Sequence, residues 1–322
     1  MAILIREDLA KMMEEEASRP IDISSTPLTQ RAFRPRFGGS PWLLLFPGAL
    51  GLSVFVIIPS LAIVALSLSH WNLYSSHVRW SGLSNYLSLV HSQAFWSSLE
   101  HTLVYSLVVG GVLLPFALGL AWILNQSFLG KELYRMIIFL PYVIPLAATG
   151  VIFSGLLAPS GIADALLGFM HITPPNWLGS VRWALVAIIG VSIWEYLGFY
   201  MLLFLSALQQ LNPSLSEAAA MDGAGWWSRF WRIVIPQIMP TILFASVMIV
   251  VQTFQAFDQI YVMTSGGPAG ATTTLIYYIY EQGFQFFNIG QASAASVVMM
   301  VLVGLIVALE WYASAKWGGD PS

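Results

Sequence analysis

The chain has 322 residues, of which 57% are hydrophobic and 9% are charged, and its formal net charge is −3. Because soluble domains carry about 25% charged residues, this composition excludes a water-soluble protein and indicates an integral membrane protein. The negative net charge argues against a nucleic-acid partner, and the lack of cysteine excludes disulfides, zinc–thiolate sites and thiol catalysis.

Residues 1–40 differ in character from the rest of the chain. They hold six Lys or Arg residues, the acidic run Glu14–Glu16 and three prolines. They lack the short apolar run and the small-residue cleavage site of a signal peptide. We therefore interpret 1–40 as a polar N-terminal tail on the cytoplasmic side, and 41–322 as one transmembrane domain.

Long apolar stretches predict the membrane spans. A helix that crosses a hydrocarbon core of roughly 30 Å needs about 20 mostly apolar residues. Six stretches qualify, which predicts an all-α membrane protein with six transmembrane helices. They run approximately over Trp42–Leu68, Thr102–Leu124, Met136–Ala158, Trp183–Ala207, Ile238–Phe257 and Ala292–Ala313. The prolines inside them (Pro59, Pro115, Pro141 and Pro145) mark either a transport pathway or plain structural bends.

The basic residues predict the orientation. Eleven of the 13 Lys and Arg residues lie in the tail, in the second and fourth loops and at the C-terminus, whereas only Arg79 and Arg182 lie in the odd-numbered loops. Because loops rich in Lys and Arg stay in the cytoplasm, both termini and the even loops are expected on that side. The expected location is a cytoplasmic membrane crossed several times.

The fourth loop, residues 212–236, combines several helix signals. Asn212-Pro213 ends the preceding span, and Ser214 with Glu217 fits a capping box. The following alanines favour a helix, and Gly223 suits the left-handed position that ends one. A second, amphipathic segment begins at Trp226, and Pro236 opens the next span. These features alone are also those of an ordinary connection between two spans.

The spacing within this loop resembles the EAA motif of ABC importer permeases. Glu217-Ala218-Ala219, three residues, Gly223, nine residues and then Ile233-Val-Ile235-Pro236 follow the family pattern, with Ile235 in place of Leu. The resemblance implies a type I importer permease (MetI-like) core, in which this stretch forms the coupling helix that docks on an ATPase subunit. The residues it assigns to ATPase coupling are Glu217, Ala218, Ala219, Met221, Asp222 and Gly223.

Further fragments are similar to the sugar branch of that family, the maltose-type and glycerol-3-phosphate-type permeases. They include Gly82-Leu-Ser-Asn-Tyr86, Asn176-Trp177-Leu178 and Tyr261-Val-Met-Thr264-Ser-Gly-Gly-Pro268, in the same order. The resemblance implies a bacterial or archaeal inner-membrane permease paired with a second homologous permease, two ATPase subunits and an extracytoplasmic solute-binding protein.

The same resemblance places ATP hydrolysis on another chain. The sequence contains no GxxxxGK[ST] phosphate-binding loop, so ATP and Mg²⁺ are expected on the partner ATPase, with no cofactor or metal in this chain. We therefore expect a transport subunit and not an enzyme, whose solute is a carbohydrate and whose other contact is lipid.

Polar residues inside the fourth and fifth spans are candidates for the substrate path. Glu195 lies in the middle of a span, where an ionisable group is costly and suggests a function. It departs from the neutral or basic residue common there in the branch, and its role, a structural pair or a solute contact, stays open. The other candidates, chosen because sugars need hydrogen bonds and aromatic faces, are Ser192, Tyr200, Gln252, Thr253 and Gln255. Such residues also hold membrane helices together.

Other functions fit the sequence less well. A permease of the same family for a non-sugar solute, such as a polyamine or a sulfonate, is the nearest alternative. A proton-coupled secondary carrier would need several buried acids or bases along a path, and Glu195 alone gives thin support. A haem-carrying redox subunit would need histidine pairs within spans, whereas all five histidines lie in or beside loops of the non-cytoplasmic side.

Overall fold

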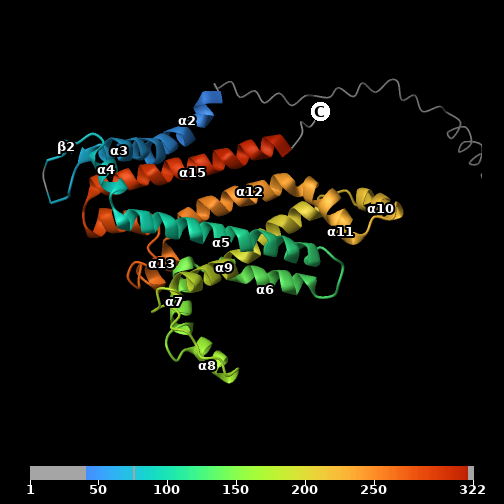
Figure 1. The fold of residues 1–322 in the computed structure, drawn as a ribbon. Coiled ribbons are helices and arrows are strands. Elements are labelled where there is room, and N and C mark those ends of the chain that lie inside the picture. Colours follow the sequence, from blue (N-terminus) through green and yellow to red (C-terminus); the bar gives the residue numbers. More distant parts are fainter. Residues whose placement is uncertain (1–40, 75–76, 318–322) are drawn as a thin grey trace, which may run out of the picture. The chain divides into compact units, whose positions relative to one another are not determined.

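The computed structural model of the protein describes residues 41–74 and 77–317, and the expected tail 1–40 lies outside them (Figure 1). The chain divides into two compact units at residues 54 and 55. The described part of the first unit is the helix α2 (Pro41–Leu52) and the start of the π-helical turn η2 (Ser53–Ile57). The second unit holds all the remaining elements, and the sites described below lie within it.

The second unit is almost entirely helical. Its one sheet is a pair of two-residue antiparallel strands, β1 (Ser69–His70) and β2 (Arg79–Trp80). The long helices are α5 (Gln93–Leu124), α9 (Ala184–Gln209), α12 (Ile235–Phe254) and α15 (Ile289–Trp317), and the shorter ones of the first half are α3 (Ile58–Ser67), α4 (Ser84–Val90), α6 (Lys131–Val143), α7 (Leu146–Leu156) and α8 (Ile162–Phe169). The short elements of the second half are α10 (Pro213–Met221), α11 (Trp226–Arg229), η3 (Phe230–Val234), α13 (Asp258–Met263), α14 (Leu275–Tyr280) and η4 (Glu281–Gln285).

The candidate membrane spans agree in number with the six predicted only if one bent pair of helices is counted as a span. By length and composition, five helical segments of the described chain can cross a membrane: Leu45–Ser67, Gln93–Leu124, Ala184–Gln209, Trp226–Met263 and Ile289–Ala313. A sixth is formed if α6 and α7 are taken together. The sequence placed the start of the second span at Thr102, but the helix begins at Gln93, where Ser92 accepts a hydrogen bond from the Phe95 backbone N–H.

The third predicted span, Met136–Ala158, is not one helix. It is divided into α6 and α7, whose axes differ by 97°. The cause is Pro145, which lacks a backbone N–H and forces the residue before it out of the helical region; Ile144 accordingly has the extended torsion angles φ −75° and ψ 133°. Pro141, by contrast, sits within α6 without ending it.

The core is built from α5, α9 and α12, which contact one another (Figure 1). Their contact faces carry small or apolar residues that are fully buried, among them Val109, Ala117, Ile188 and Ala245. Gly198 allows the closest approach, since a β-carbon there would overlap the Ile138 carbonyl oxygen on α6. The α6 backbone therefore lies directly against α9.

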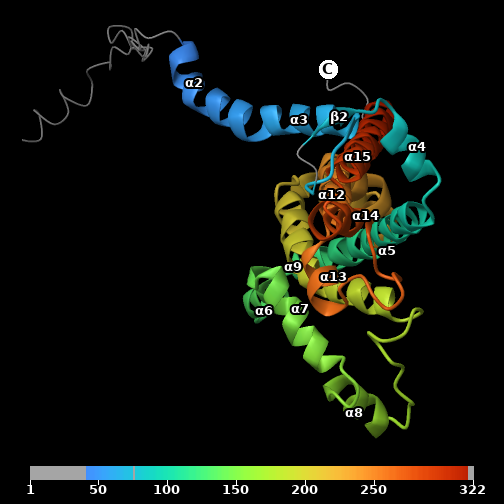
Figure 2. The same cartoon turned by 90° about the vertical axis from the view of Figure 1, so that its left-hand side faces the viewer.

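The loops gather at two ends of this bundle. One end carries the connection 125–130, α10 and α11, and the opposite end carries β1, β2, α4 and α13 (Figure 1). The view turned by 90° also shows α14 beside the first turns of α5, and α8 beyond α7 (Figure 2). The two loops that hold Lys131, Arg135, Arg229 and Arg232 thus share one end.

Candidate functional site

The short helix α10 occupies the position predicted for the coupling helix. Its N-cap is Asn212, whose side-chain oxygen accepts a hydrogen bond from the Ser214 backbone N–H, so the predicted Ser214 capping box is wrong. Pro213 explains the difference, because its missing N–H suits the first helical position and the cap therefore lies two residues earlier than Ser214. Helix residues Ala218 and Met221 are exposed, and the side chain of Glu217 lies outside the described part.

Gly223 ends α10 as the sequence predicted. Its φ of +81° is left-handed, where a side chain would be strained. The Gly223 N–H donates to the Ala220 carbonyl at 3.0 Å, and the Ala224 N–H donates to the Ala219 carbonyl at 2.9 Å. This pair of bonds is a Schellman motif. It fixes the direction in which the chain leaves α10.

An aromatic cluster joins this end of the protein to the core. We use this term for Trp122, Trp226, Trp227, Phe230 and Trp231. The ring centroids of Trp122, on α5, and Phe230, on η3, are 4.9 Å apart. Trp226 lies 5.9 Å from Trp122, and Trp227 lies 5.8 Å from Trp231. The aromatic cluster therefore connects α11 and η3, which lead into α12, directly to α5.

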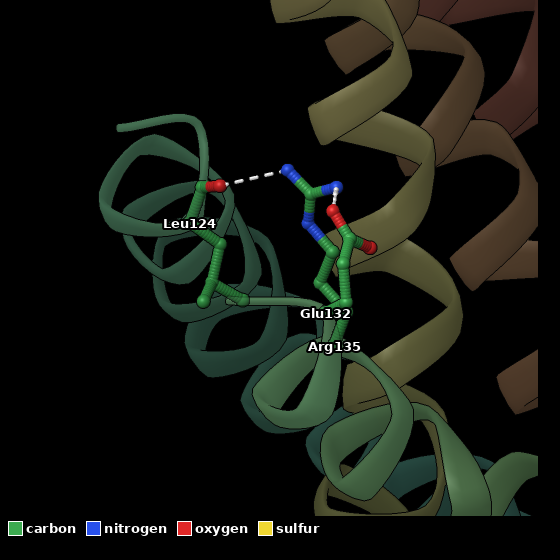
Figure 3. Close-up of polar contacts among 3 residues, drawn as sticks. All are labelled: Leu124, Glu132 and Arg135. Carbon is green, nitrogen blue, oxygen red and sulfur yellow. Dashed lines mark hydrogen bonds and ion pairs between the residues drawn. The ribbon is translucent and has the colours of Figure 1, made fainter. Parts of the chain in front are cut away.

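Arg135 fastens the neighbouring loop at the same end (Figure 3). Its guanidinium donates to the Leu124 carbonyl at 2.9 Å and to Glu132 Oε1 at 2.7 Å. Leu124 is the last residue of α5, so its carbonyl has no partner within the helix. The side chain of Arg135 is only 15% exposed. It therefore caps α5 and closes the connection to α6.

Four of the six predicted substrate-path residues form side-chain hydrogen bonds that join one core helix to another. Tyr105 OH on α5 donates to Ser192 Oγ on α9 at 2.8 Å, and Tyr200 OH on α9 donates to Gln252 Oε1 on α12 at 2.9 Å. The hydroxyls of Ser106 and Thr253 join α5 to α12 at 2.7 Å. In this conformation the three pairs form a polar seam between the core helices.

The other two path candidates differ from the seam. Gln255 is exposed and is the C-cap residue that follows the last residue of α12. Glu195 is 1% exposed, and its Oε1 accepts a hydrogen bond from Thr149 Oγ1 on α7 at 3.3 Å. Its second oxygen, Oε2, is buried without a hydrogen-bond partner among the described residues. Of the path candidates, Glu195 alone keeps an unused buried polar atom.

A cavity of about 740 Å³ lies at the end opposite α10, and we call it the end cavity. Its apolar wall includes Val104, Val108, Leu185, Val186, Ile189 and Phe286. Its polar lining residues are Ser97, His101, Arg182, Thr273, Glu281 and Gln282. Sequence reasoning missed it, because it used Arg182 and His101 only for orientation and to exclude haem. The residues come from segments far apart in the chain, so no local spacing signalled them.

Burial affects the acid in this cavity. The partial burial of Glu281 raises the pKa of its carboxyl above the ordinary value. Neither Glu281 nor Arg182 forms an ion pair with another described residue. The end cavity thus presents an unpaired cation and an unpaired acid to the same space.

The packed spans, the exposed α10 and the loops at two ends define a polytopic helical membrane protein. Residues 111–313 match the family model described as the binding-protein-dependent transport system inner membrane component. The lactose transport system permease protein LacF of Rhizobium radiobacter is 34% identical over 281 residues, covering 85% of this chain and 94% of the relative. The sn-glycerol-3-phosphate permease UgpA of Yersinia enterocolitica is 34% identical over 280 residues, covering 85% and 94%.

A solved structure shows the same fold. In the crystal structure of a bacterial alginate ABC transporter with an alginate pentasaccharide-bound periplasmic protein, one chain matches with a TM-score of 0.76 at 24% identity, covering 85% of this chain and 93% of that one. The protein belongs to the permeases of binding-protein-dependent ABC importers. It is a multi-pass inner-membrane protein and the permease subunit, not the catalytic subunit, of such a transporter.

Proposed function

We propose that this permease imports a carbohydrate or a closely related solute, delivered by an extracytoplasmic binding protein. The support comes from relatives of similar length that are named for lactose and sn-glycerol 3-phosphate. Hydrogen-bonding side chains on α9 and α12 supply the groups that a polyhydroxylated solute needs. Those candidates are Ser192, Glu195, Tyr200, Gln252, Thr253 and Gln255.

In this proposal import is driven through α10, and the observation that carries it is the place of the EAA spacing in the structure. The EAA spacing falls on an exposed helix whose end is fixed by Gly223. The contact residues for one of two ATPase subunits are Glu217, Ala218, Ala219, Met221, Asp222 and Gly223. ATP and Mg²⁺ bind on that partner, and a second homologous permease completes the pore. Both termini and the α10 end face the cytoplasm, in keeping with the basic residues of the two loops there.

Movement of α10 opens the path. ATP-driven closure of the ATPases displaces α10, the aromatic cluster passes the displacement to α5 and α12, and the polar seam between these helices exchanges its bonds. Ser192 and Thr253 are almost fully buried in the present conformation. Solute contact at these two hydroxyls therefore requires α5 to separate from α9 and α12.

The test uses the whole importer in proteoliposomes. Glu217→Lys and Gly223→Pro should leave the permease in the membrane but abolish ATPase binding and ATP-driven uptake of lactose or sn-glycerol 3-phosphate. Leu129→Lys is the matched control, because Leu129 is 99% exposed in the other loop at the same end. Survival of uptake and ATPase binding in both α10 variants would overturn the coupling role.

The same assay separates the alternative functions. Uptake of spermidine or taurine in place of lactose and sn-glycerol 3-phosphate would replace the solute class but keep the importer. Uptake that continues without ATP and stops when a protonophore is added would point to the proton-coupled carrier. We expect neither result, since Glu195 is the one acid buried to this degree among the described residues.

A further inference from the structure

We propose that the end cavity is a staging site for a neutral saccharide, held by Arg182, Glu281 and Phe286 before it enters the membrane path. The inference rests on the proposed function, because it assumes that the end opposite α10 faces the binding protein. It adds a binding site to the path residues on α9 and α12. None of those six candidates lines the end cavity.

The size and shape of the cavity suit a small ligand. A volume of about 740 Å³ lies in the range of roughly 300–1,000 Å³ typical of small-molecule sites. A flat docking surface for a protein would not be hollowed to this degree. The lining comes from α5, the start of α9, the loop before α14, and η4, so the ligand would touch elements that are separated in the chain.

Hydrogen bonds hold the walls in place without a ligand. The Leu275 backbone N–H donates to Thr102 Oγ1 at 2.7 Å, which ties the start of α14 to α5. His101 Nδ1 lies 3.1 Å from the Thr273 carbonyl oxygen, joining the same two segments. Within the loop, Thr272 Oγ1 donates to the Gly267 carbonyl at 2.8 Å. The cavity is therefore formed in advance, which lowers the cost of binding.

The charges select the chemistry of the ligand. Arg182 supplies donors only, whereas the Glu281 carboxylate supplies acceptors, and neither is paired among the described residues. A sugar hydroxyl donates and accepts, so a neutral saccharide satisfies both groups at once. An anionic solute would meet the Glu281 carboxylate, and a cationic solute would meet Arg182. The partial burial of Glu281 makes a second negative charge there still more costly.

Aromatic and apolar groups complete the match. Phe286 is 58% exposed and lines the cavity, so its ring face is available to the C–H face of a sugar. A zwitterion would also satisfy both charges but would leave this ring and the rest of the apolar wall without a partner. A saccharide can contact the charged groups, the aromatic ring and the apolar wall together.

The chain's lack of cysteine allows a direct test by labelling. Ser97→Cys introduces one thiol in the cavity lining, and Val78→Cys introduces one at an exposed site that does not line it. Both are labelled in the assembled importer with a membrane-impermeant methanethiosulfonate. We expect lactose at millimolar concentration to slow labelling of Ser97→Cys at least fivefold and to leave Val78→Cys unchanged.

Four outcomes would overturn the staging site. The first is that lactose gives no protection, and the second is that glycine betaine or sn-glycerol 3-phosphate protects instead. The third is that solute-free binding protein alone protects as well as lactose does, which would make the cavity a protein docking site. The fourth is that Ser97→Cys is unreactive in the assembled importer, which would mean that the second permease covers it.

Kinetics separate this site from the proposed function. Glu281→Gln and Phe286→Ala should each raise the KM for lactose uptake by about tenfold with little change in kcat, whereas α10 variants should lose kcat. Glu100→Gln is the matched control, since Glu100 is exposed beside His101 but does not line the cavity. Lactose protection without lactose uptake would keep the site and remove the proposed function. Lactose uptake without lactose protection, and with KM unchanged in both cavity variants, would keep the proposed function and remove the staging site.

Discussion

The hydroxyl of Thr149 on α7 donates a hydrogen bond of 3.3 Å to the buried carboxyl of Glu195 on α9. Sequence reasoning left open whether Glu195 pairs with a protein group or with solute, and this bond supplies the protein partner. The second oxygen of the carboxyl remains without a partner among the described residues. Glu195 thus links the half-span after the Pro145 break to the core while keeping one polar atom free.

Removing the Thr149 hydroxyl should lower the free energy of unfolding more than neutralising Glu195 does. Thr149→Val leaves Glu195 with no hydrogen bond, and we expect it to lower the free energy of unfolding by about 1–3 kcal/mol. Glu195→Gln keeps a group that accepts from Thr149 and lowers the cost of burying a charge, so its stability should equal or exceed that of the wild type. Thermal unfolding of the purified permease in detergent measures both. An unchanged midpoint for Thr149→Val would show that the bond contributes nothing.

Gly198 should tolerate no side chain. The β-carbon of Gly198→Ala overlaps backbone atoms of Ile138 and Phe139, which cannot move as a side chain end would. We expect a loss of about 1–3 kcal/mol from overpacking between α6 and α9. Gly190→Ala on the same helix is the control, because nothing lies within 4 Å of its added β-carbon. Equal unfolding midpoints for the two variants would contradict this packing.

Arg135 caps the C-terminal end of α5, so we expect even the charge-conserving substitution Arg135→Lys to destabilise this end of the protein. Arg135→Lys keeps the charge but cannot bridge Leu124 and Glu132 with a planar fork. Loss of a charged hydrogen bond at a buried carbonyl costs about 1.5–3 kcal/mol, and most of this should appear in the lysine variant. Arg232→Lys is the control, since Arg232 is exposed at the same end. Limited proteolysis of the connection 125–130 should accelerate in Arg135→Lys alone.

The raised pKa of the Glu281 carboxyl predicts that the stability of the protein depends on pH. Burial raises the pKa of its carboxyl, while Arg182 and His101 line the same cavity and Tyr277 and Tyr278 lie nearby. A raised folded-state pKa gives stability that is fully present below the unfolded value of about 4.3 and is lost as the pH rises through the folded value. Glu281→Gln should therefore unfold at a higher temperature than the wild type near neutral pH, and the difference should vanish in acid. Glu100→Gln, at an exposed site, should show no such trend, and parallel pH profiles for all three proteins would refute the burial effect.

The sequence by itself determined the class of protein, five of the six predicted spans as helices and the end of α10. Hydropathy is a sum along a local stretch of chain, so it depends little on what packs against that stretch. The left-handed position of Gly223 and the helix 213–221 likewise follow from neighbouring residues. The capping residue was misplaced by two positions, because Asn212 and Ser214 are both good caps and Pro213 decided between them.

Only the tertiary structure decided how the spans use their polar groups. Whether Ser192 faces Tyr105 or open space depends on the rotation of α9 against α5, and one sequence carries no information on that angle. The 97° break after α6 shows the same limit, since Pro141 and Pro145 look alike in sequence, yet only the second ends a helix. The end cavity joins Arg182 to Glu281 across 99 positions of the chain. Contacts of this kind arise from the packing of whole helices, and no local pattern contains them.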